Sequence, residues 1–165
     1  MIKKLHVKNI ALIDDMTLSF HDGLTALTGE TGAGKSIIME SLQLLFGKRS
    51  DQDLIRHGFE EAVVSGEFIL NETVSKTFDL PLETTITRVM NRSGRHVMKL
   101  NGQTTTLQFI KQLTAHIGDI HEQDDMFQLL DVQSYVQLID ARDRNQIEPL
   151  KVNYIMKKSE YEDAV

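Results

Sequence analysis

The chain has 165 residues, of which 41% are hydrophobic and 25% are charged, and it carries a formal net charge of −6 and no cysteine. This length suits one folded domain, and the lack of cysteine excludes disulfides, thiolate metal sites and thiol nucleophiles. The acidic balance argues against a chain whose main surface binds a phosphate backbone, because such surfaces are usually basic.

The first third of the chain is predicted to run from three strands through a glycine-rich loop into a helix. Residues 2–8 and 16–20 have the pattern of short strands. Residues 24–28, LTALT, are apolar and rich in threonine, as a buried strand should be. Residues 36–46 place apolar side chains at helical spacing until Gly47 ends the helix.

The middle of the chain is predicted to be mostly strands. Residues 62–70 read as one strand, and residues 85–91 and 95–100 as the two arms of a hairpin. A short helix is expected at 107–113, and one more strand at 117–121.

The last forty or so residues have a helical pattern, which begins near Met126. Apolar side chains recur at alternating spacings of three and four, and Lys157 takes one position of the same helix face. The apolar positions are Ile147, Leu150, Tyr154, Tyr161 and Ala164. This spacing predicts the opening of a coiled coil, and an ordinary amphipathic helix fits the same residues. Pro149 is expected to begin a helix, since a missing N–H costs nothing in a first turn.

The segment between the predicted third strand and the first helix matches a phosphate-binding motif. Its sequence, GETGAGKS, fits G-x-x-x-x-G-K-[ST] at every position. Glycines let successive backbone N–H groups point at phosphate oxygens, and the following helix adds its positive end. Lys35 would reach the β and γ phosphates of ATP, and the Ser36 hydroxyl would bind Mg²⁺. The candidate nucleotide-binding residues are Gly29, Glu30, Thr31, Gly32, Ala33, Gly34, Lys35 and Ser36.

The motif supplies half of an ATPase site. Hydrolysis also needs a carboxylate at the end of an apolar strand, which holds Mg²⁺ through water. After Lys35 no four apolar residues precede an Asp or Glu in a strand pattern: residues 116–119 are too polar, and residues 136–140 fall in a helical pattern.

The sequence resembles the RecN family of bacterial DNA repair proteins, which is related to SMC proteins. The resemblance rests on LHVKNIALIDDMTLSFHDGLTALTGETGAGKSIIMESLQLLFGKRS and continues through DLIRHGFEEAVVSGEF, RSGRHVMKLNGQTTTLQFIKQL and IGDIHEQDDMFQLLD. It implies an α/β P-loop NTPase, an ABC-ATPase-type amino-terminal lobe with a mixed β-sheet around the phosphate-loop helix, followed by a helical coiled-coil tail. Residues 1–130 would be the lobe and residues 131–165 the helical segment that leads into the coiled coil. The chain would then be a fragment of a longer protein.

The resemblance also assigns a role to Gln123, in IHEQDD. The family has a glutamine at this place that joins Mg²⁺ and the attacking water, and a neutral amide can do both. Glu122 and Asp124 depart from the family pattern. On this view Lys35 and Gln123 are catalytic and Ser36 and Gln123 hold Mg²⁺, whereas without the family Gln123 reads as a solvated loop residue.

Several arginines have two interpretations each. Arg56, in LIRHG, resembles a family position near the nucleotide, where it would contact phosphate or the opposing head, and a surface arginine is the alternative. Arg88, Arg92 and Arg95 surround the predicted hairpin turn, where they would belong to a solvated tip or touch DNA phosphate.

The resemblance implies a set of partners. These are the carboxy-terminal lobe of the same head, a second head that joins in an ATP-dependent dimer, and DNA bound by the assembled protein during double-strand break repair. The family places its signature motif, Walker B carboxylate and switch histidine after the coiled coil. We therefore expect this chain to bind ATP and Mg²⁺ without hydrolysing ATP alone.

The expected location is the bacterial cytoplasm, near the nucleoid. No apolar stretch approaches the roughly 18 to 20 residues of a membrane helix, and the start lacks the apolar segment of a signal peptide. Other interpretations stay open. They are another SMC or RecF-type head, a small kinase or GTPase, and a non-enzymatic module in which the nucleotide is a structural ligand.

Overall fold

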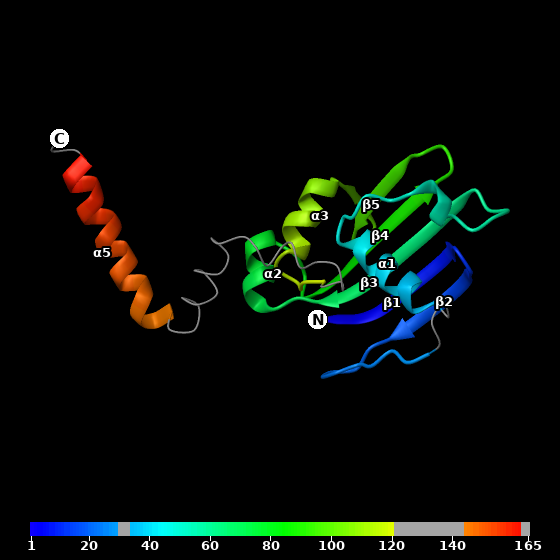
Figure 1. Ribbon diagram of the computed structural model, residues 1–165, viewed down its shortest axis with the longest axis horizontal. Helices are drawn as coiled ribbons and strands as arrows, with labels where there is room; N and C mark the ends of the chain where they lie inside the picture. Colours follow the sequence, from blue (N-terminus) through cyan, green and yellow to red (C-terminus); the bar gives the residue numbers. More distant parts are fainter. Residues whose placement is uncertain (30–33, 121–143, 163–165) are drawn as a thin grey trace. The chain divides into compact units, whose positions relative to one another are not determined.

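A six-stranded sheet forms the centre of residues 1–120 in a computed structural model of the chain (Figure 1). The structure describes residues 1–29, 34–120 and 144–162. Among these, neighbouring strands all pair antiparallel, in the order β2-β1-β3-β4-β5-β6. The strands are β1 (Ile2–Ile10), β2 (Ile13–Ser19), β3 (Glu61–Ile69), β4 (Glu83–Asn91), β5 (His96–Leu100) and β6 (Gln103–Thr105).

The first helix, α1 (Lys35–Leu45), packs against one face of this sheet and contacts β3, β4 and β1 (Figure 1). The strands alternate buried and less buried residues with a period of two, so that β3 turns Val64 and Phe68 toward the core and β4 turns Ile86 and Met90. The helix adds the fully buried Leu44 and Leu45. This packing fixes the helix that follows the phosphate-loop motif.

The other helices of this unit are η1 (Gln52–Leu54), α2 (Glu72–Phe78) and α3 (Leu107–Thr114). Asn71 caps α2, because its side chain accepts from the Val74 N–H at 2.8 Å, and Thr106 caps α3 in the same way. The rings of Phe78 and Phe109 meet edge to face at 5.8 Å, which joins α2 to α3.

The second unit, residues 121–165, contains the helix α5 (Arg144–Glu162). This confirms the helical pattern over that range. Pro149 lies inside α5, so the prediction that it begins a helix is wrong. A proline in a helix interior removes one hydrogen bond and crowds the preceding turn, at a cost of about 3 kcal/mol. Leu150, Tyr154 and Tyr161 are exposed on α5, and the coiled coil stays a prediction.

Two predicted strands are not formed in the residues that the structure describes, 24–28 and 117–120, and residue 121 lies outside them. Residues 24–28 have no regular structure, and Leu24 is 98% exposed. A strand needs neighbours for its N–H and C=O groups, and no described strand pairs with this segment. Ile117 and Gly118 instead donate their N–H groups to the Thr114 carbonyl, so residues 117–120 begin as a turn at the end of α3.

Gly66 lies where β3 passes beneath α1. A Cβ there would come within 2.7 Å of the Phe68 ring and 2.8 Å of the Leu45 side chain. We expect Gly66→Val to lower the free energy of unfolding by about 1–3 kcal/mol, because a packed core resists added volume. Urea denaturation measures this change. Thr85→Val, on the opposite face of the sheet, is the control, and equal stability of the two variants would contradict this view of the packing.

Candidate nucleotide-binding site

The phosphate-loop motif ends at the first turn of α1. Gly34 is the N-cap residue, and its φ of 93° lies in the left-handed region that favours glycine. No side chain caps the helix, and its first turn carries no acidic residue. The Ile38 N–H donates to the Gly34 carbonyl at 3.0 Å and begins the helical ladder. An uncapped helix start without a competing carboxylate suits an anionic ligand such as a phosphate.

Lys35 folds back over the motif. Its ammonium group donates a hydrogen bond to the Gly29 carbonyl, so the first residue of the motif lies beside the start of α1. Ser36 follows Lys35 in the first turn and is exposed. The structure thus brings Gly29, Gly34 and Lys35 together, and their role in nucleotide binding stays a prediction. The predicted contacts of residues 30–33 and of Gln123 lie outside the described residues.

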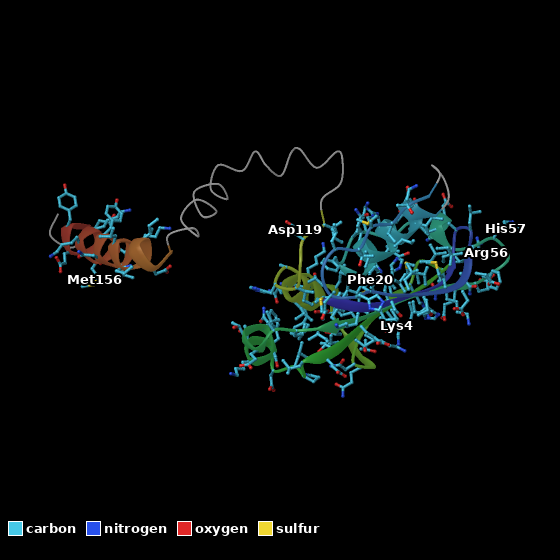
Figure 2. All side chains as sticks on the ribbon, turned by 90° about the horizontal axis from the view of Figure 1, so that it is seen from below. Lys4, Phe20, Arg56, His57, Asp119 and Met156 are labelled. Atoms are coloured by element: carbon cyan, nitrogen blue, oxygen red, sulfur yellow. The ribbon has the colours of Figure 1, made fainter. Side chains whose placement is uncertain are left out.

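Arg56 holds a loop to the turn between β1 and β2. Its Nη1 donates to the Leu12 carbonyl at 2.7 Å, and its backbone N–H donates to the Asn9 carbonyl at 2.9 Å. Figure 2 shows Arg56 beside His57 at one end of the sheet. Within residues 1–29, 34–120 and 144–162, no hydrogen bond joins Arg56 to Gly34 or its neighbours in α1. Its role beside the nucleotide stays a prediction.

Arg88 is buried, which the interpretation of the sequence did not predict. The hairpin pattern put it at a solvated tip or on DNA, yet it is 2% exposed. Its Nη1 donates to the carbonyls of Leu44 at 2.8 Å and Lys48 at 2.6 Å. Burial lowers the pKa of Arg88. The signal was available in the alternation of β4, since Arg88 shares a face with Ile86 and Met90.

A cavity of about 730 Å³ lies at the carboxy-terminal end of α1, beside Gly47. Its lining includes three cations, Arg49, Arg88 and Lys111, and two carboxylates, Asp51 and Asp53. The cavity is at the opposite end of α1 from the motif, and Arg88, its buried cation, already donates to backbone carbonyls. We therefore do not assign the nucleotide to it.

His96 lines the same cavity, and Ser50 Oγ lies 3.1 Å from its Nδ1. His96 is exposed, and desolvation by the atoms around it, followed by the charge of Arg88, lowers its pKa. The His96 ring therefore binds a proton less readily in the folded chain than in the unfolded chain. As a result, the contribution of His96 to the free energy of unfolding falls as the pH drops below about 6.5.

We expect His96→Gln to reduce the loss of thermal stability on acidification. Melting curves of both chains at about pH 7 and about pH 5.5 measure the difference. Because the carboxylates titrate alike in both chains, only the His96 contribution separates them. Equal losses of Tm in the two chains would contradict the lowered pKa.

Two further observations concern the described ranges alone. In residues 1–29, 34–120 and 144–162, no three side chains of His, Cys, Asp or Glu come together to form a candidate metal site. None of the helices there combines the length and the hydropathy that a membrane span requires.

Comparison with known proteins gives the family. Residues 4–164 match the family described as "AAA domain". The DNA repair protein RecN of Bacillus subtilis is 35% identical over 148 residues, which are 85% of this chain and 26% of that protein. RecN of Rickettsia prowazekii is 34% identical over 146 residues, or 86% of this chain and 26% of the relative. The chain thus spans about a quarter of the length of these curated relatives.

A solved structure agrees with the sequence relatives. The Smc head domain with a coiled coil and joint derived from Pyrococcus yayanosii is 26% identical, has a TM-score of 0.68, and matches 91% of this chain and 35% of its own. The fold is therefore that of the amino-terminal lobe of a P-loop ATPase head of the ABC type. The chain belongs to the AAA-domain family and is a RecN-like, SMC-related fragment within it.

Proposed function

We propose that this chain is the ATP-binding half of a split ATPase head in a RecN-like protein that acts in DNA repair. The start of α1 carries the proposal: a left-handed Gly34, no side-chain cap, and a Lys35 ammonium held at the Gly29 carbonyl. These features stand within a complete G-x-x-x-x-G-K-[ST] sequence.

Different residues of the motif would bind the phosphates and the Mg²⁺ ion. Backbone N–H groups from Gly29 to Ser36 would hold the phosphates, and Lys35 would exchange its bond to the Gly29 carbonyl for the β and γ phosphates. The Ser36 hydroxyl would bind Mg²⁺, which neutralises charge on the phosphate oxygens. Gln123 is proposed as a second Mg²⁺ ligand that orients water, and Arg56 as a contact to phosphate or to the opposing head.

The proposal extends to the parent protein. Residues 1–130 would be the lobe and residues 131–165 the start of a coiled coil, with the carboxy-terminal lobe completing the head and a second head closing over ATP. The relatives are named DNA repair proteins, which supports DNA as a partner of the assembled protein and a place beside the nucleoid in the cytoplasm.

Calorimetric titration of ATP and Mg²⁺ into the chain tests the proposal, with phosphate release followed in the same samples. We expect binding without turnover, because the sequence after Lys35 has no carboxylate at the end of an apolar strand. Turnover by a pure sample would overturn the half-site and favour a small P-loop enzyme. Absence of binding by a folded sample would overturn the proposal that this chain is the ATP-binding half of the head.

A further inference from the structure

Arg88 is a charged residue in an apolar setting. It lies on the core side of β4 between Ile86 and Met90, which are 0% and 1% exposed. Transferring a guanidinium from water into such a setting is costly unless its donors find acceptors. The acceptors it has found therefore indicate what the side chain does.

Those acceptors belong to the end of α1 and the segment that follows it. Arg88 Nη1 donates to the Leu44 and Lys48 carbonyls, and Nη2 donates to Ser50 Oγ at 3.2 Å. Leu44 is in the last turn of α1, beyond which the regular helical donors end, and its carbonyl also accepts from the Gly47 N–H at 3.2 Å. A cation at this end also complements the helix dipole. One side chain thus ties β4 to the carboxy-terminal end of α1.

The opposite end of α1 carries the phosphate-binding residues. The helix has eleven residues, so its two ends are roughly 16 Å apart at the usual rise. Ile38 and Leu45 anchor α1 on the sheet through apolar contacts, which have little directional preference. The hydrogen bonds of Arg88 are directional and fix how far along the sheet the helix lies.

We infer that Arg88 is a positioning residue for nucleotide binding, which holds α1 so that Gly34, Lys35 and Ser36 meet the phosphates. The inference rests on the proposed function, since it assigns Arg88 to the same site. A helix that shifts along its axis displaces every N–H donor at its start. Displacements near 1 Å can cost about two orders of magnitude in function.

Four variants separate positioning from loss of stability. Arg88→Met keeps most of the volume and removes the donors. Arg95→Met is the charge control, because Arg95 is an exposed arginine of the turn between β4 and β5 and its loss removes the same charge. Val74→Ala is the stability control, since Val74 is a buried residue of α2. Arg88→Lys restores a cation with fewer donors.

The measurement is ATP affinity by calorimetry at a temperature where each variant is folded, with amide hydrogen exchange at Ile38. We expect Arg88→Met to weaken binding by about tenfold or more and to speed exchange at Ile38, whose N–H makes the first bond of α1. The affinities of Arg95→Met and Val74→Ala should stay within about twofold of that of the unaltered chain, and Arg88→Lys should fall between these controls and Arg88→Met.

Two results would overturn the inference. One is an Arg88→Met chain that binds ATP as tightly as the unaltered chain, and the other is an equal loss in Val74→Ala. If the unaltered chain does not bind ATP, the proposed function fails, and Ile38 exchange still decides the role of Arg88: equal rates in Arg88→Met and Val74→Ala would refute it. If Arg88→Met does not fold, Arg88→Lys is judged by the same two readouts, and unchanged values in it would count against positioning.

Discussion

Lys35→Ala is expected to weaken the binding of ATP and Mg²⁺ to this chain by about 100-fold, or about 2.7 kcal/mol. Lys35 is the one basic residue between Thr28 and Ser36, and its ammonium already lies at the motif through its bond to the Gly29 carbonyl. Removing it leaves the β and γ phosphates without their charge-assisted donor. Calorimetric titration of both chains measures the loss.

Lys76→Ala is the matched control for this prediction. Lys76 is an exposed lysine of α2, paired with Glu72 at 3.5 Å, so its loss removes the same charge from the chain at another place. We expect its ATP affinity to equal that of the unaltered chain. Equal affinities of Lys35→Ala and the unaltered chain would remove Lys35 from the site.

Leu45→Ala is expected to lower the free energy of unfolding by about 2–5 kcal/mol, the range for leucines buried in a core. Leu45 is 0% exposed and lies in the last turn of α1. Leu24→Ala should change stability by less than about 0.5 kcal/mol, because Leu24 is 98% exposed. Urea denaturation of the three chains measures both values.

This pair of leucines also tests the correction to the predicted third strand. A large loss of stability in Leu24→Ala would mean that residues 24–28 are buried in the folded chain, as the apolar pattern suggested. A small loss in Leu45→Ala would mean that α1 is not packed as the structure has it. Either outcome would change the description of the segments on the two sides of the motif, residues 24–28 and α1.

The sequence predicted well those elements that are recognised from residues close together in the chain. The alternation in residues 62–70 and 85–91 predicted β3 and β4, because side chains on a strand alternate between two faces. The helical spacing after the glycines predicted α1, and Gly47 follows its end with a φ of 92°. The phosphate-loop motif was found in full, since its chemistry depends on residues that are adjacent in the chain.

Where structure depends on distant partners, the sequence was less informative. Residues 24–28 have the composition of a buried strand, but composition does not supply the strand beside it, and Leu24 is exposed. The helix α2 was missed because it is short, although Asn71 and Glu72 form a typical helix start. Arg88 was assigned to a hairpin tip because its acceptors on Leu44 and Lys48 lie about forty positions earlier.

The most direct test of the nucleotide site is to record the amide chemical shifts of an isotope-labelled chain while ATP and Mg²⁺ are added. We expect the largest changes on Gly29 and on Gly34, Lys35 and Ser36 at the start of α1. Changes confined to Asp51 and His96, beside the cavity at the other end of the helix, would contradict this expectation and move the ligand away from the motif.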